Sequence, residues 1–151
     1  MADVTLDFNK VLAALNQVNS LSLPGLNAAE SSALLFNVLN LLLCDEYSVR
    51  DYAQHSVSKL IEIISDQIFL SCEKWILTQI KVNRNELVVK SVLATFKLFI
   101  ARAKANPIKG CVSGDLYPLI HVQKNEEDFL SNILSMQIQQ RQKALRKLVN
   151  I

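Results

Sequence analysis

Apolar residues recur every three or four positions along almost all of this sequence, which is the spacing of the buried face of an α-helix. The first such stripe runs from Val4 through Phe8 to Val18. Further helices are expected over about residues 27–44, 48–64, 65–80 and 85–100. Only three glycines and three prolines occur in 151 residues, whereas sandwiches and barrels need many glycine-containing turns. The sequence therefore predicts an all-α fold.

Polar residues at the expected helix starts supply candidate caps. Asn27 or Ser31 is expected to cap the second helix, Ser48 the third and Asn85 the fifth, because a side-chain oxygen there can accept from the first unpaired amides. Asp51 follows Ser48 by three positions, which is a loose form of the capping box.

Residues 107–125 are expected to be irregular, because they contain two of the three glycines and two of the three prolines. A loop of this length within a helical domain indicates an insertion or a contact surface. A short helix is expected after it, from Asn125 or Glu126 to about Ser135, and a last helix from about Gln137. Acidic residues at the start of the short helix (Glu126, Glu127, Asp128) are favoured there by the helix dipole.

The third and fifth helices repeat one apolar pattern at an offset of 39 residues. The matched pairs are Val49 and Val88, Ala53 and Val92, Val57 and Phe96, Leu60 and Phe99, and Ile61 and Ile100. A basic residue lies close to the start of both, at Arg50 and Lys90. A period near 40 with two helices per unit is typical of HEAT and armadillo arrays. The pattern predicts an α-α superhelix of about seven helices in imperfect pairs, and a generic helical bundle is the alternative.

The turn before the third helix resembles the second helix of a HEAT repeat, in the order Asp45, Val49, Arg50, Ala53 and Leu60. In that pattern the aspartate accepts from amides of the turn and the basic residue bonds back to it. The last helix carries Leu145, Leu148, Val149 and Ile151, which are typical of an inner helix that awaits a following repeat. We therefore expect residues 1–151 to be one HEAT-like segment of a longer array.

The closing stretch "DFLSNILSMQIQQRQKALRKL" is similar to a segment of the large HEAT-repeat protein of the small-subunit processome, the down-regulated-in-metastasis family, and "DLYPLI" at 115–120 suits the same family. The matching positions are Asp128, Phe129, Asn132, Ile133, Gln137, Ile138, Arg141, Ala144, Leu145, Arg146 and Leu148. The sequence departs from the family at Ser135 and Gln139, where histidine is usual, and at Gln140, where arginine is usual. The resemblance implies a nucleolar scaffold for assembly of the small ribosomal subunit and processing of its RNA precursor, with processome proteins and pre-ribosomal RNA as partners.

A cluster of basic residues in the last helix is the candidate binding site: Arg141, Lys143, Arg146 and Lys147. Such a patch can hold RNA phosphates, and a solvated outer face is the alternative.

Charge is uneven along the chain. Residues 1–70 hold three basic and eight acidic residues, a net of −5, and residues 71–151 hold 13 basic and six acidic, a net of +7. The asymmetry favours an anionic partner for the second half.

We find no sequence motif for catalysis. The glycines fit no phosphate-binding loop, and the three cysteines (Cys44, Cys72, Cys111) form no zinc or disulfide pattern with His55 or His121. Reduced thiols suit the cytosol or nucleus, and no apolar run is long enough to cross a membrane. The sequence therefore predicts a non-catalytic scaffold without cofactor, metal or small-molecule substrate. A protein-only HEAT or armadillo-type adaptor in transport or signalling is the alternative, and a small helical enzyme is a third possibility.

Overall fold

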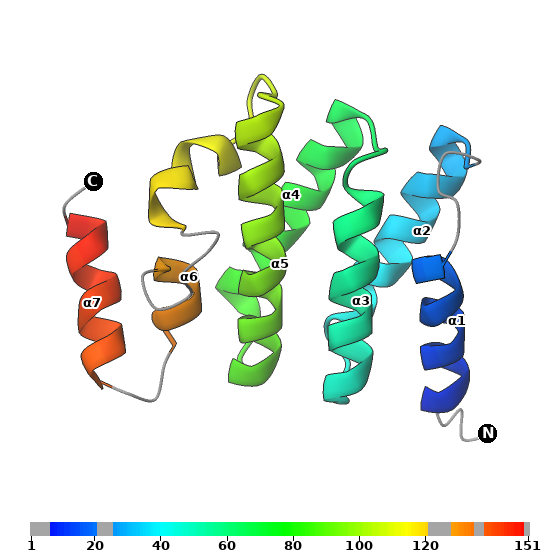
Figure 1. The fold of residues 1–151 in the computed structure, drawn as a ribbon, viewed down its shortest axis with the longest axis horizontal. Helices are drawn as coiled ribbons and strands as arrows, with labels where there is room; N and C mark the ends of the chain where they lie inside the picture. The colour runs from blue at the N-terminus through cyan, green and yellow to red at the C-terminus, as the bar shows by residue number, and fades with distance from the viewer. Residues whose placement is uncertain (1–6, 21–25, 121–127, 135–137, 150–151) are drawn as a thin grey trace. The chain divides into compact units, whose positions relative to one another are not determined.

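The computed structural model describes residues 7–20, 26–120, 128–134 and 138–149. These residues form helices and no strand (Figure 1), so the all-α prediction is confirmed for them. The finer expectation of a HEAT-like superhelix stays a prediction. The chain divides into two compact units, residues 1–65 and residues 66–151.

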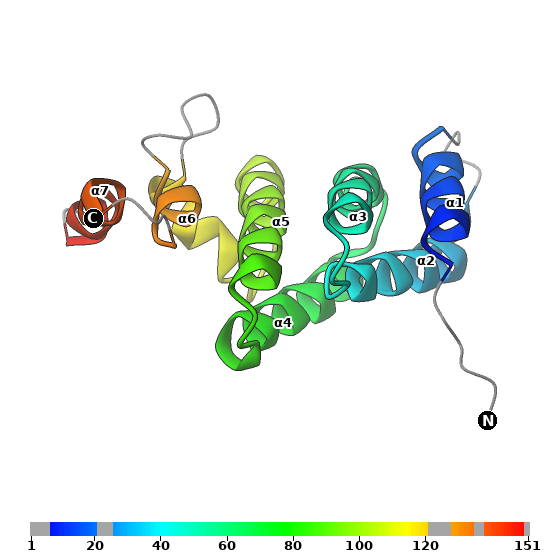
Figure 2. The same ribbon diagram turned by 90° about the horizontal axis from the view of Figure 1, so that it is seen from below.

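Unit 1 consists of three helices, α1 (Phe8–Ser20), α2 (Ala28–Leu41) and α3 (Tyr47–Leu60). Helix α3 packs against both α1 and α2 (Figures 1 and 2). The buried apolar residues of this unit are Leu15, Leu35, Val38, Leu39, Leu42, Val49, Ala53, Val57, Leu60, Ile61 and Ile64. Val4 of the predicted first stripe lies outside the described residues.

The predicted cap of α2 is confirmed at Asn27, and it forms a complete capping box. The Asn27 side-chain oxygen accepts from the amide of Glu30 at 2.8 Å, and the Glu30 carboxylate accepts from the amide of Asn27 at 3.0 Å. Ser31 lies one turn further on, where its hydroxyl donates to the carbonyl of Asn27. Two amides at the start of α2 are therefore satisfied by side chains.

The predicted cap of α3 at Ser48 is wrong. The helix begins at Tyr47 with Glu46 as its N-cap residue, and no side chain caps it. The buried Arg50 organises this turn instead, because its Nη1 donates to the carbonyl oxygens of Cys44 and Asp45, each at 2.8 Å. The basic residue thus bonds back to the main chain of the turn, and helix α3 starts earlier than a serine cap would allow.

Unit 2 contains α4 (Asp66–Val82), α5 (Glu86–Ala105), the 3₁₀-helix η2 (Ser113–Leu119), α6 (Phe129–Asn132) and α7 (Ile138–Val149). Helix α5 packs against α4, η2 and α6, and α7 packs against α6. The rings of Phe69 and Phe99 meet in the core with centroids 4.9 Å apart. The other fully or nearly buried apolar residues are Cys72, Ile76, Val88, Val92, Leu93, Phe96, Ile100, Ala103, Ile108, Leu119, Ile120, Leu130 and Ala144.

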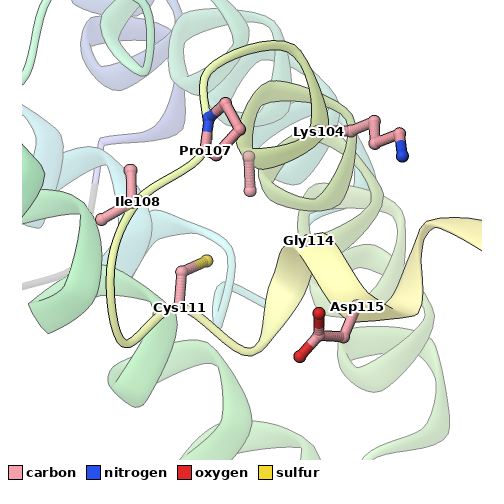
Figure 3. A pocket seen from close by; sticks show the side chains of 7 residues that line it. Lys104, Pro107, Ile108, Cys111, Gly114 and Asp115 are labelled. Atoms are coloured by element: carbon pink, nitrogen blue, oxygen red, sulfur yellow. The ribbon is translucent and has the colours of Figure 1, made fainter.

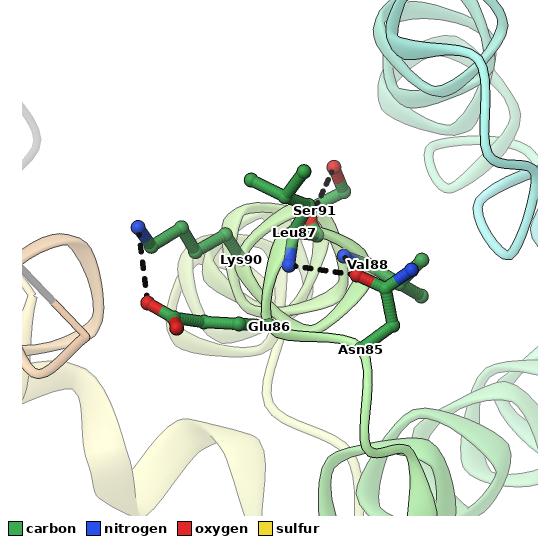
Figure 4. Close-up of polar contacts among 6 residues, drawn as sticks. All are labelled: Asn85, Glu86, Leu87, Val88, Lys90 and Ser91. Atoms are coloured by element: carbon green, nitrogen blue, oxygen red, sulfur yellow. Dashed lines mark hydrogen bonds and ion pairs between the residues drawn. The ribbon is translucent and has the colours of Figure 1, made fainter.

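The predicted cap of α5 at Asn85 is confirmed (Figure 4). Its side-chain oxygen accepts from the amides of Leu87 at 3.1 Å and Val88 at 3.4 Å. An exposed ion pair between Glu86 and Lys90, 3.3 Å long, follows on the first turn. Lys90 therefore plays a different role from the buried Arg50, with which the repeat pattern had paired it.

The expectation that residues 107–125 are irregular is wrong for Ser113–Leu119, which form η2. The short helix expected to start at Asn125 or Glu126 is α6, and it covers only Phe129–Asn132. Residues 121–127 and Ser135 lie outside the described residues. Helix α7 begins at Ile138, close to the expected start.

The helix starts carry the period that the apolar pattern suggested. Ala28 of α2 and Asp66 of α4 are 38 positions apart, and Tyr47 of α3 and Glu86 of α5 are 39 positions apart. All ten residues of the matched apolar pairs are buried. The α2–α3 pair and the α4–α5 pair therefore correspond in the positions of their helix starts, and α3 and α5 correspond in their buried residues as well.

Candidate functional site

Helix α7 carries all four predicted contact residues within its 12-residue length. Arg141, Lys143 and Arg146 are exposed, and Lys147 is half-buried. Successive residues of an α-helix are about 100° apart around its axis. Lys143 and Arg146 therefore share one side of α7, whereas Arg141 lies well around the helix from Lys143.

The side of α7 that meets α6 is narrow. Ala144 is 3% exposed, and Gln140 and Lys147, four positions before it and three after it, are half-buried. Positions related by three and four residues lie on one helix face. Ala144 is thus the centre of the buried side of α7.

A separate apolar stripe on α7 is exposed. Leu145, Leu148 and Val149 are 50%, 46% and 82% exposed, and their spacing of three and four residues places them on one face. We define the α7 stripe as these three residues. The helix is amphipathic, but part of its apolar face does not pack against α6.

Helix α6 is held in place by a buried ion pair. Lys97 of α5 lies 2.5 Å from the carboxylate of Asp128, and the two side chains are 19% and 0% exposed. Asp128 is also the N-cap residue of α6, since its side chain accepts from the amide of Ser131 at 3.1 Å. The Asn132 side chain donates back to the carbonyl of Asp128 at 2.7 Å. These contacts fix α6 on α5 and thereby position α7.

Asp128 was predicted correctly to lie at the start of a helix, but its ion pair with Lys97 was not predicted. Glu126 and Glu127 of the same acidic cluster lie outside the described residues. An aspartate directly before two apolar residues is a local capping signal. Lys97 is 31 positions earlier, so no local pattern could have paired the two residues.

A second buried carboxylate, Glu73 of α4, holds the segment before η2. It accepts from the Cys111 thiol at 3.0 Å, the Val112 amide at 3.2 Å and the Ser113 amide at 2.8 Å, and also from the Ser113 hydroxyl. Burial by itself would raise the pKa of Glu73, but the hydrogen bonds from Ser113, Cys111 and Val112 lower it below its ordinary value. Sequence reasoning missed this residue because its partners lie about 40 positions away.

A surface pocket of about 240 Å³ lies beside this segment (Figure 3). Its lining comes from the end of α5 and the segment that follows: Ala103, Lys104, Pro107, Ile108, Cys111, Gly114 and Asp115. The volume is below the usual range for small-molecule sites, about 300–1,000 Å³. The Lys104 ammonium lies 5.5 Å from the centre of the Tyr117 ring, in cation–π geometry. The pocket is therefore part of the packing between α5 and η2.

The cysteines do not form a reactive group in the described part of the chain. Burial raises the pKa of Cys72 to about 12, and burial together with the hydrogen bond to Glu73 raises the pKa of Cys111. A thiolate is the reactive form of cysteine, so these shifts suppress reactivity. Cys44 is half-buried.

The two histidines were the remaining candidates for a ligand or a catalytic base. His55 is exposed, and its Nδ1 lies 2.9 Å from the carbonyl oxygen of Asp51. His121 lies outside the described residues. Across residues 7–20, 26–120, 128–134 and 138–149, no three His, Cys, Asp or Glu side chains gather closely enough to hold a metal ion. None of the described helices is both long and apolar enough to cross a membrane.

The geometry thus concentrates the candidate contacts on α7, which carries both the four cations and the α7 stripe. No family model, curated protein or solved structure matches the chain.

Proposed function

We propose that this protein is a non-catalytic helical scaffold in small-subunit ribosome assembly and pre-ribosomal RNA processing, and that it works in the nucleolus. It would hold RNA and protein partners by extended surface contact. The single observation that carries the proposal is α7, a helix with four cations and no acidic residue. The resemblance of residues 115–151 to the processome family supplies the setting.

Phosphate recognition needs positive charge on a rigid element and no particular base-reading side chain. Lys143 and Arg146 meet that need, since both are exposed on the same side of α7. No aromatic residue lies in α7, so stacking on unpaired bases is not expected. The proposed contact is therefore with the RNA backbone.

The periodic helix starts support the scaffold part of the proposal. Corresponding helices of the two pairs start 38 and 39 positions apart, and the buried residues of α3 match those of α5, which agrees with an array of HEAT-like pairs. Such arrays present long surfaces for partners.

The test is binding of the full chain to a structured pre-ribosomal RNA fragment over a range of salt concentrations. Lys143→Ala/Arg146→Ala should weaken binding and reduce the slope of log K against log[salt] by about 0.9 for each phosphate that the variant no longer neutralises. Lys74→Ala/Lys81→Ala removes two exposed cations from α4 and is the matched control. Equal weakening in the two double variants would mean diffuse attraction and would contradict a site on α7.

The alternative is a protein-only adaptor, and the exposed α7 stripe favours a protein contact of some kind. Affinity purification from cells separates the two functions. Recovery of processome proteins with pre-ribosomal RNA supports the scaffold. Recovery of cytosolic cargo without that RNA supports the adaptor.

A further inference from the structure

The α7 stripe is an apolar surface on a helix whose packing side is already occupied. Figure 2 shows α7 end-on with α6 beside it, and Ala144 supplies the buried contact. Ala144 and the stripe centre at Leu145 are consecutive residues, so they point about 100° apart. The stripe centre is therefore turned away from the buried side of α7, and Leu148, four positions after Ala144, lies between the two.

Cations border this stripe. Arg141 is four positions before Leu145 and seven before Leu148, so it continues the same face. Arg146 is three positions before Val149 and lies along the other edge. Both arginines are exposed, and α7 has no carboxylate to neutralise them. A helix that covers the stripe would bring its own flanking residues next to two guanidinium groups.

We propose that the α7 stripe is the docking site for an amphipathic helix of a protein partner, with leucine-like residues that cover the stripe and carboxylates on its flanks. Helical partners of this kind bind through apolar anchor residues that are three and four positions apart. Aspartate or glutamate at the edges would meet Arg141 and Arg146. This contact goes beyond the RNA contact proposed above and does not depend on it, because its apolar part is the α7 stripe. Arg146 borders both surfaces.

Charge argues against a second copy of this chain as the occupant through the same helix. Two α7 helices that meet through the stripe would bring Arg141 and Arg146 of one copy next to the same two residues of the other, with no acidic residue in either helix. Like charges across a helix–helix seam oppose pairing, and opposite charges select the partner. RNA alone is also a poor occupant, because phosphates gain nothing from Leu145, Leu148 and Val149.

The experiment uses the full chain and three designed helical peptides. The first has leucines at spacings of three and four with glutamates on both flanks, the second has lysines in place of the glutamates, and the third has alanines in place of the leucines. Binding is followed by fluorescence anisotropy of labelled peptide. The glutamate peptide should bind saturably and the other two should not.

Two double variants of the chain and one control variant complete the test. Leu145→Gln/Leu148→Gln keeps charge and helix propensity, and it should weaken binding of the glutamate peptide about tenfold. Arg141→Glu/Arg146→Glu should reverse the preference toward the lysine peptide. Leu87→Gln, which changes an exposed leucine on α5, is the control and should leave binding unchanged.

Four results would overturn the proposal. These are no saturable binding of the glutamate peptide, equal binding of the lysine peptide, no effect of the two glutamines, or self-association of the chain that the two glutamines abolish. The last result would identify a second copy as the occupant. Failure of RNA binding leaves these peptide results unchanged, so the two proposals fail separately.

Discussion

Two buried charged side chains, Arg50 in unit 1 and Glu73 in unit 2, are both stabilised by hydrogen bonds to main-chain groups. A buried charge is costly unless hydrogen bonds replace its water. Arg50 donates to two carbonyl oxygens of its turn, and Glu73 accepts from two main-chain amides, a thiol and a hydroxyl. Each charge therefore holds a turn through main-chain groups.

Glu73→Gln should destabilise unit 2. The glutamine amide nitrogen would place hydrogens against groups that donate, so at least one donor near Ser113 would be left without an acceptor. A hydrogen bond to a charged group contributes about 1.5–3 kcal/mol, and we expect the free energy of unfolding to fall by about 2 kcal/mol. Urea unfolding followed by fluorescence measures it, because Trp75 of α4 is the single tryptophan of the chain and reports on unit 2.

The same variant should show a defined pH dependence. The pKa of Glu73 is lowered from 4.5 in the folded protein, because hydrogen bonds from Ser113 and Cys111 outweigh the raising effect of burial. Its stabilising effect is therefore complete above pH 4.5 and is lost as the pH falls through the folded pKa. The difference between wild type and Glu73→Gln should be full at pH 7 and shrink below pH 4.5. Glu86→Gln, at an exposed ion pair, should cost no more than about 0.5 kcal/mol.

At the level of single elements, α6 is too short to be stable by itself. It has four residues, far fewer than an isolated helix needs in water. Its stability comes from Leu130, which is buried, and from the cap and ion pair of Asp128. The element is therefore a product of its tertiary contacts.

Asp128→Asn should loosen α6 and α7 while α4 and α5 stay protected. Asparagine still caps a helix as well as aspartate does, so the variant removes the ion pair with Lys97 and keeps the cap. Removing one partner of a buried pair costs about 3 kcal/mol. Hydrogen exchange should accelerate at residues 129–133 and 138–149. Asp115→Asn, an exposed aspartate of η2, is the control. Unchanged exchange in α6 and α7 would contradict the anchoring role of Asp128.

Sequence patterns predicted a helix correctly where contacts between residues close in sequence determine its start and its buried face. Helix α5 has its expected cap at Asn85 and its expected buried residues. The start of α3 was predicted wrongly because Arg50 sets that turn from within the core. The 3₁₀-helix η2 was missed because Glu73, which holds its first residue, is 40 positions earlier. Sequence spacing gives no information on such contacts.

At the scale of the whole molecule, the chain consists of two compact units, and we expect each to fold by itself. Residues 66–151 produced alone should be helical by circular dichroism and should keep the Trp75 emission of the full chain. Residues 1–65 alone should also be helical. If either segment is unfolded when produced alone, the two units do not fold independently.

The placement of the four basic residues was predicted, because they lie close together in one expected helix, and the structure places all of them on α7. Their role in binding stays a prediction. Which side of α7 is covered and which is open depends on where α6 lies. The position of α6 in turn depends on Lys97 and Asp128, which are distant in sequence. The sequence was thus sufficient to predict which residues α7 carries, but not which side of α7 is covered by α6.

The ion pair of Lys97 and Asp128 has a consequence for genetics. A screen for loss of partner binding would recover substitutions at these two residues, although both are buried or nearly so and lie outside the helix whose surface they support. Such alleles would resemble contact mutants in the screen. Exchanging the two charges, Lys97→Asp with Asp128→Lys, would restore an ion pair but not the cap that Asp128 gives α6, so we expect partial suppression. True contact alleles on α7 would be suppressed only by changes in the partner.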